Sequence, residues 1–444
     1  MNKIGKIRKV SYLLIIRLWG DGMMKKRIFS FLGVFLFIAS GVFAGDTLTI
    51  QDIVQQGLLK SSAVRSKKAA YEAARAKVIK AWLPEDPMAG IDVEGQREIF
   101  KTGSRMNYET MVSQSVPFPT TLFLRGIAAS KEADMAYQDF KEEERKVAWG
   151  VEQPVYSLFL TKKTIQALEE TKTLLEQFSR AVRARYEAGQ AGQIDSLKVG
   201  IELSQVNVEI FEWKQKEHVA NAEVARQLNQ PMGMVYEIDE KTTGEKEELS
   251  YSDLEKAALD TKPELQMLKA AVEKARTESL LAKTDWLPEL TGRVEIRDFT
   301  QEGREREVDN FIGFSVPVWS LVKGLGGAWR GADEEVKAAE ALVVDMKNEV
   351  LLHVHHAFSR VSAARFAIET FEKETLPQAR QQVQIALSGY EAGKVDVLML
   401  IDAQRTLKNL QIQYYKALAE YEMGLSDLRL AVGRNLKGAK KGEK

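Results

Sequence analysis

The sequence contains no cysteine and only four histidines among its 444 residues. Without cysteine the chain forms no disulfide and offers no thiolate to a metal site. Basic and acidic residues are equal in number, at 63 each, so no positive excess favours a nucleic-acid partner. Catalytic patterns are missing as well. Gly324–Gly331 resembles a phosphate loop but lacks the Lys-Ser/Thr of a P-loop, and no nucleophile–base arrangement stands out, so we expect neither an enzyme nor a cofactor.

Long apolar runs are also scarce. One run, Ile28–Ile38, follows the basic start Met24–Arg27 and precedes the small-x-small exit Val42–Ala44. This order predicts a signal peptide cleaved after about Ala44 and favours Met23 or Met24 as the true start. Residues 1–44 carry eight basic residues and one acidic residue, so the remainder is acidic by seven charges. Beyond them no stretch is long and apolar enough for a membrane helix, so a membrane would have to be crossed by strands.

An internal repeat organises the rest of the chain. Tyr-Glu-Ala-Gly opens both Tyr186–Leu203 and Tyr390–Leu407, and the offset is 204 residues. The same offset relates Trp82-Leu83-Pro84 to Trp286-Leu287-Pro288. Two landmarks with one offset indicate a duplicated unit of domain size.

Each copy of the unit reads as a helix, two short strands, a very long helix and a medium helix. We expect the first repeat over 45–231, with strands near 89–100 and 107–116 and a long helix interrupted at Pro154. A connector over 232–250 leads to the second repeat over 251–436, with strands near 290–299 and 309–318, and a basic tail over 437–444 ends the chain. The fold class is therefore mainly α with a small β part.

The strands are about ten residues long, which suffices to cross a bilayer when they tilt. Ile312, Phe314 and Val316 would face lipid, and charged residues of the preceding strand, Arg293, Glu295 and Arg297, would face water. Four strands alone leave two edges unpaired in lipid, so several copies of the chain would have to close a barrel.

The chain resembles the TolC family of outer-membrane efflux ducts. The resemblance covers nearly all of it after residue 44 and rests on the repeat, the paired hairpins and the segments Tyr186–Leu203 and Tyr390–Leu407, with Ile401–Leu407 matching closely. The hairpin exits Ser113–Pro119 and Phe314–Val318 also fit.

The resemblance implies a homotrimer with a twelve-stranded barrel in the outer-membrane lipid of a Gram-negative bacterium and a helical tunnel in the periplasm. It implies a periplasmic adaptor (membrane fusion) protein and an inner-membrane pump of the RND or ABC type as partners. Pro84–Pro87 and the Val-Pro-Phe-Pro exit lean toward the branch that serves cobalt-zinc-cadmium or copper exporters.

The same resemblance implies a gate near the helix junctions. Asp402 takes the position of a ring aspartate, although a second ring position is Met399. Asp195 and Tyr390 match latch residues, although Val395 replaces an arginine. Three symmetry-related Asp402 carboxylates would attract cations; the alternative is an acid that merely faces solvent near a helix start. The glycines of the two junctions, Gly189 and Gly393, are expected in turns that need permissive φ/ψ.

Three histidines, His353, His355 and His356, form the only histidine cluster. His353 and His356 share a helix face and are the candidates for a metal site there, whereas His355 points elsewhere. No cysteine completes a ligand set, so an ordinary helical surface is favoured. The glycine-rich segment Gly324–Gly331 is expected to form a flexible joint between strands and helix. The rival to a duct is a periplasmic coiled-coil scaffold without a pore, which would not need four alternating strands.

Overall fold

The computed structural model describes residues 49–94, 107–238, 249–298 and 306–434. Residues 48–444 form one unit, and residues 1–47, which carry the expected signal peptide, form another outside the described part. The tail over 437–444 and most of the connector also lie outside the described residues. Among the described residues, no helix is both long and apolar enough to cross a membrane.

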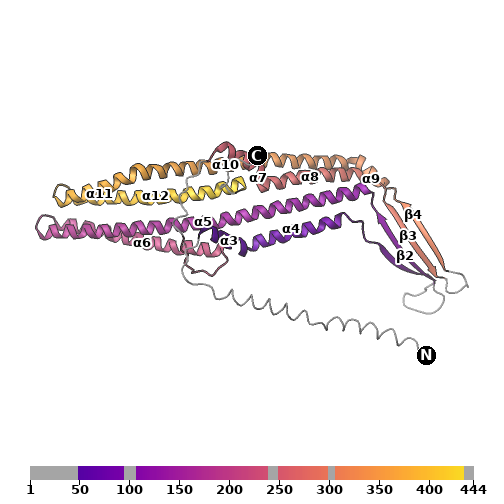
Figure 1. Cartoon of the computed structure of the whole chain (residues 1–444), viewed down its shortest axis with the longest axis horizontal. Coiled ribbons are helices and arrows are strands. Elements are labelled where there is room, and N and C mark those ends of the chain that lie inside the picture. The colour runs from indigo at the N-terminus through magenta and orange to yellow at the C-terminus, as the bar shows by residue number, and fades with distance from the viewer. Residues whose placement is uncertain (1–48, 95–106, 239–248, 299–305, 435–444) are drawn as a thin grey trace, which may run out of the picture. The chain divides into compact units, whose positions relative to one another are not determined.

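Within the larger unit each repeat places a two-stranded hairpin at one end of its helices, and the two hairpins join in one sheet (Figure 1). The first repeat consists of α3 (Ile50–Lys60), α4 (Ser62–Ala81), β1 (Met88–Glu94), β2 (Asn107–Val116), α5 (Pro119–Glu187) and α6 (Gln193–Gln227). The second consists of α7 (Tyr251–Thr261), α8 (Pro263–Thr284), β3 (Leu290–Asp298), β4 (Glu307–Phe314), α9 (Val318–Lys323), η3 (Gly324–Ala328), α10 (Trp329–Thr370), η4 (Phe371–Thr375), α11 (Leu376–Glu391) and α12 (Val397–Val432).

The first helix of each repeat is divided, which the periodicity did not predict. Ser61 is extended, with ψ 122°, and its side chain accepts a hydrogen bond from the backbone N–H of Val64, so it ends α3 and caps α4. In the second repeat Lys262 is extended and Pro263 occupies the first turn of α8. Proline pushes the preceding residue out of the helical region, which explains the break.

By contrast, the interruption expected at Pro154 does not occur, since α5 runs unbroken for 69 residues. Val151 and Val155 on either side of it are almost fully buried. A proline inside a helix removes one backbone hydrogen bond, and burial of its neighbours compensates for that loss here.

Strand boundaries also differ from the expected ones. β1 is described to Glu94, and residues 95–106 lie outside the described part. β4 ends at Phe314 rather than at Val318, which already begins α9. Pro317 between them cannot donate a ladder hydrogen bond and is the N-cap residue of that helix.

The helices pack through three buried clusters that join segments far apart in the sequence. One cluster lies where α5 and α6 meet α11 and α12, and includes Phe178, Val206 and Leu400. The second joins α7, α10 and α12, and the third joins α3, α5 and α6. The first cluster mixes residues of both repeats, so neither repeat completes its core alone.

Gly126 on α5 lies against the indole of Trp82, and we expect Gly126→Ala to lower the free energy of unfolding by about 1–3 kcal/mol. A Cβ at this position would come within 2.3 Å of the ring. Chemical denaturation of the purified protein measures the change. Gly150→Ala is the matched control on the same helix, because its Cβ would meet Gln227 at an ordinary 3.6 Å. Equal losses in both variants would show that the Trp82 contact is not the cause.

Candidate functional site

Two regions of the larger unit carry the features that bear on function, the sheet and the opposite ends of the long helices (Figure 1). The strand order is β1-β2-β3-β4, and all three pairings are antiparallel. The β2–β3 pairing joins the two repeats. Among the described residues β1 and β4 each pair on one side only, so both outer edges of the sheet are open.

One face of the sheet is apolar and exposed. The register places Ile91, Thr110, Ile296 and Val308 in one row across the four strands. Ile312 and Phe314 lie on the same face and are 81% and 71% exposed. Apolar side chains this exposed on neighbouring strands form a patch that needs a cover.

The opposite face is charged. Arg297 lies in register with Glu109 on one neighbouring strand and Glu307 on the other. Its Nη2 atom lies 2.7 Å from Oε1 of Glu295, and its Nη1 atom lies 3.5 Å from a carboxylate oxygen of Asp309. The separation of charged from apolar residues agrees with the alternation in the sequence, except that Val316 lies beyond the end of β4. A sheet with one apolar and one ion-paired face can separate lipid from water.

At the far end of the helices, two tight turns connect α5 to α6 and α11 to α12. Gly189 and Gly393 lie in these turns with φ values of +72° and +74°. Only glycine adopts such values without strain. A Cβ at Gly393 would also come within 3.1 Å of an Nη atom of Arg185, so this turn brings the two repeats together.

Arg185, near the end of α5, contacts Tyr390 just before the turn between α11 and α12. Its guanidinium donates a hydrogen bond to the backbone carbonyl of Tyr390 and lies 4.9 Å from the centre of that residue's ring. Sequence reasoning missed Arg185, although it directly precedes the Tyr-Glu-Ala-Gly motif of the first repeat. Arg185 places a cation at this end of the helices, whereas position 395, where the resemblance implies an arginine, is a valine.

The latch expected between Asp195 and Tyr390 is not a hydrogen bond in the described chain. The Tyr390 hydroxyl is buried and has no hydrogen-bond partner. Burial raises the pKa of Tyr390, the charge of Asp195 raises it further, Arg185 lowers it, and Asp396 adds a smaller upward contribution. The hydroxyl therefore stays protonated at neutral pH.

Two ion pairs join α6 to α12 above the turns. The Nε atom of Arg405 lies 2.9 Å from both carboxylate oxygens of Glu202, which is buried, and Lys408 donates to Glu209 at 2.9 Å. Together with Arg185 they hold the two helix pairs in one arrangement. Asp402, one turn from Arg405, is exposed, and its carbonyl accepts a hydrogen bond from Thr406.

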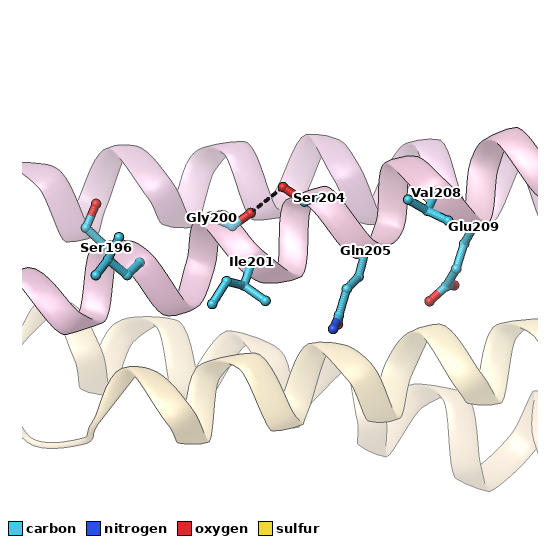
Figure 2. Close-up of a pocket in the computed structure, with 8 residues that line it drawn as sticks. Ser196, Gly200, Ile201, Ser204, Gln205, Val208 and Glu209 are labelled. Atoms are coloured by element: carbon cyan, nitrogen blue, oxygen red, sulfur yellow. Dashed lines mark hydrogen bonds between the residues drawn. The ribbon is translucent and has the colours of Figure 1, made fainter.

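An open groove runs along α6 beside these pairs (Figure 2). Ile201, Gln205 and Glu209 extend from α6 toward the yellow helices of the second repeat, while Ser204 donates to the carbonyl of Gly200 at 2.9 Å. Ile194, Leu197, Ile201 and Val208 are all more than half exposed. Their spacing of three, four and seven is that of a coiled-coil seam, and no helix of the described ranges covers these four side chains fully.

The histidine cluster and the glycine-rich segment lie on the second repeat. His353, His355 and His356 are exposed, and His355 packs edge-on against the ring of Tyr251 at 5.7 Å. Over the described ranges no group of three His, Asp or Glu side chains could hold a metal ion. In the glycine-rich segment, Gly327 has φ +128°, which kinks the chain between α9 and α10.

The chain is similar in sequence to known outer-membrane proteins. Residues 254–434 match the family model "Outer membrane efflux protein". The chain is 21% identical over 311 residues to the cobalt-zinc-cadmium resistance protein CzcC of Cupriavidus metallidurans, covering 69% of this chain and 72% of that one. It is 24% identical over 344 residues to the alkaline protease secretion protein AprF of Pseudomonas aeruginosa, covering 74% and 70%.

The fold also recurs among solved structures. The transmembrane channel protein CusC superposes with a TM-score of 0.73 at 14% identity, over 89% of this chain and 96% of that one. At this identity the likeness establishes the fold. The fold class expected from the sequence, mainly helical with a small sheet, is confirmed by this match.

Proposed function

We propose that this chain is a passive exit duct. The proposal starts from the premise that the chain belongs with the outer membrane efflux proteins, as its resemblance to the TolC family predicts. The observation that carries the proposal is the four-stranded sheet with two open edges, an exposed apolar face and an ion-paired opposite face. Open edges are unstable in lipid because each unpaired backbone group costs several kcal/mol.

Three copies would remove these edges by pairing β4 of one chain with β1 of the next, which gives a closed barrel of twelve strands. The exposed seam on α6 supports the same association, because a coiled-coil seam needs a second helix. A β4–β1 pairing between chains joins two different surfaces, so it is a head-to-tail contact. Head-to-tail contacts form a closed ring when the rotation from one copy to the next adds up to a full turn. The helical ends would then surround a tunnel on the periplasmic side of a Gram-negative outer membrane.

A duct of this kind needs partners that supply energy and cargo. We propose a periplasmic adaptor and an inner-membrane pump, of the RND or ABC type, that engage the end formed by the turns at Gly189 and Gly393. One relative is named for cobalt-zinc-cadmium resistance and the other for protease secretion. Relatives with such different cargo favour selection by the pump rather than by the duct.

The rival proposal is a periplasmic scaffold without a pore. Planar lipid bilayers distinguish the two, because purified duct inserted from detergent produces stepwise current increases. A scaffold leaves the bilayer silent while still binding helical partners. The exposed apolar face of the sheet favours the duct, since a water-soluble scaffold has no use for it.

Asp402 is proposed to form a ring of three carboxylates near the narrow end, and we expect Asp402→Ala to weaken the block of single-channel current by divalent cations. Neighbouring carboxylates around one axis concentrate negative potential and bind such ions. Glu187→Gln is the control, because Glu187 lies at the same end and is 70% exposed. Unchanged block by the Asp402 variant, or equal weakening by the control, would remove Asp402 from the ring.

A further inference from the structure

The second repeat contains a π-turn within its long helix, at a place where the first repeat has an ordinary α-helix. In η4 the N–H of Leu376 donates to the carbonyl of Phe371, five residues earlier, whereas an α-helix bonds four residues earlier. The offset of 204 residues relates η4 to residues 167–171, which lie inside the unbroken helix α5. The π-turn is therefore a feature of one repeat and does not follow from the duplication.

The buried side chains on either side of the π-turn show that it takes up one extra residue. One row of them recurs at intervals of seven, at Val354, Val361 and Ile368 on α10 and at Leu376, Val383 and Tyr390 on α11. The interval from Ile368 to Leu376 is eight. The helix α12, which lies beside α10 and α11 (Figure 1), keeps intervals of seven throughout, at Leu400, Leu407, Tyr414, Tyr421 and Leu428. When one partner alone has an extra residue, the winding of the pair changes at that residue.

The apolar core is interrupted at the same level. The buried members of the two clusters nearest to η4 are, on one side, Leu376 and Leu407 and, on the other side, Ile368 and Ala417. Between them, Phe371 and Tyr414 are only partly buried. None of the five residues of η4 is buried, and neither is any of the described residues 409–416 on α12. A layer with few buried apolar contacts opens more readily than the packed layers beside it.

Polar side chains hold this layer. The Tyr414 hydroxyl on α12 donates to Oε1 of Glu372 in η4 at 3.0 Å. Burial, followed by this hydrogen bond, raises the pKa of Tyr414 to about 12, so the hydroxyl keeps its proton at neutral pH. The Thr375 hydroxyl donates to the carbonyl of Thr370 at 3.4 Å. Pro377, which follows η4, has no N–H and cannot donate to the preceding turn, so the backbone is held less firmly here.

The two repeats are joined on both sides of this layer. On the side of α7, Nη2 of Arg429 on α12 lies 2.8 Å from a carboxylate oxygen of Glu152 on α5. On the side of the turns, the repeats are joined by the contacts of Arg185, Arg405 and Lys408. If the contacts near the turns break while Arg429 stays in place, α11 and the first part of α12 move by bending at the layer between.

We propose that η4 and residues 409–416 of α12 form a hinge in the second repeat. About this hinge, α11 and the first part of α12 would move away from α5 and α6 when the end formed by the turns opens. Hinges are short segments that absorb a change in backbone angles while the packed elements on either side stay rigid. The inference rests on the proposed function, because it identifies the moving part of the proposed duct.

Hydrogen–deuterium exchange of the detergent-solubilised protein, read by mass spectrometry, tests the hinge without a measurement of transport. Peptides over residues 369–378 are expected to exchange about tenfold faster than peptides over the counterpart 165–174 in α5, because a π-turn followed by proline has fewer and weaker backbone hydrogen bonds. Tyr414→Phe removes the hydrogen bond to Glu372 and should speed the exchange further. Equal rates in η4 and in the α5 counterpart would overturn the hinge.

Deleting Lys373 tests whether η4 contains one residue too many. Lys373 is 72% exposed, and its removal makes the interval from Ile368 to Leu376 seven. The deletion should turn the π-turn into an α-turn, slow its exchange to that of α5 and leave the unfolding midpoint no lower. The control is deletion of Ser359, which is exposed on α10 and lies in a regular stretch, so its loss should lower the midpoint. Equal losses from both deletions would overturn the hinge.

Single-channel recording in planar bilayers tests whether the hinge serves the proposed duct. We expect the protein without Lys373 to have severalfold shorter openings than the wild type, because a continuous α-helix bends less readily than a π-turn. Openings of wild-type length, with exchange at η4 slowed as expected, would overturn the hinge and leave the duct standing. A wild-type protein that produces no current would overturn the duct and the role of the hinge together.

Discussion

Replacing Arg185 with alanine is expected to shift the proposed duct toward an open state at the end formed by the turns at Gly189 and Gly393. The substitution removes a charged hydrogen bond to the Tyr390 carbonyl and a guanidinium–ring contact, worth about 2 kcal/mol together. A change of that size alters the ratio of closed to open states by about 30-fold. Single-channel recording in planar bilayers should therefore show longer openings and a higher mean conductance.

Arg183→Ala is the matched control for this experiment. Arg183 lies two residues earlier on α5, is 80% exposed and contacts only Glu187 of its own helix, at 3.8 Å, in the described structure. It should leave the currents unchanged. Arg185→Lys keeps the charge but loses the planar guanidinium group, so its open times and mean conductance should lie between those of the wild type and Arg185→Ala. If Arg185→Ala conducts like the wild type, the contact with Tyr390 does not restrain the gate.

Replacing Lys262 with methionine should lower the free energy of unfolding by about 3–5 kcal/mol, because it removes the nearer cation from a buried carboxylate. The other cation beside Glu142 is Lys146, whose Nζ atom lies farther away, at 3.7 Å. The Lys262 ammonium lies 2.9 Å from Glu142 and donates to the carbonyl of Leu430 at 3.2 Å. Both charged side chains are almost fully buried. The pair joins α5 of the first repeat to the α7–α8 break in the second, so its loss should loosen the junction of the repeats.

Denaturant unfolding of the detergent-solubilised protein measures this loss. Adding Glu142→Gln to Lys262→Met should recover much of the stability, because a neutral amide is cheaper to bury than an unpaired carboxylate. Lys67→Met is the exposed control, since Lys67 lies 2.7 Å from Asp139 and the two side chains are 42% and 43% exposed. Surface pairs contribute at most about 1 kcal/mol, so a loss in the control equal to that of Lys262→Met would contradict the argument.

The duplication and the element types could be predicted from the sequence because they depend on local periodicity. The strands alternate, the helices repeat every three to four residues, and Tyr186 and Tyr390 mark equivalent turns. The break at Lys262 could have been predicted too, since Pro263 follows it. The continuity of α5 through Pro154 could not, because it depends on burial of neighbouring valines by other helices.

The contacts between the two turns could not be predicted, for a different reason. Arg185 and Tyr390 are 205 residues apart, and their meeting depends on how two turns approach one another. Glu202 and Arg405 likewise pair across the repeats. The local sequence pattern does not reveal which residues meet when they are about 200 positions apart. The expected roles of Asp402 and Asp195 came from resemblance, and they remain proposals that electrical recording can decide.

We propose that the strand edges left open in one chain are paired by other copies of it. Native mass spectrometry of the protein purified in detergent tests this most directly. We expect a complex of three chains that persists after the detergent is stripped in the gas phase. A single-chain mass from protein that stays soluble in buffer without detergent would contradict it.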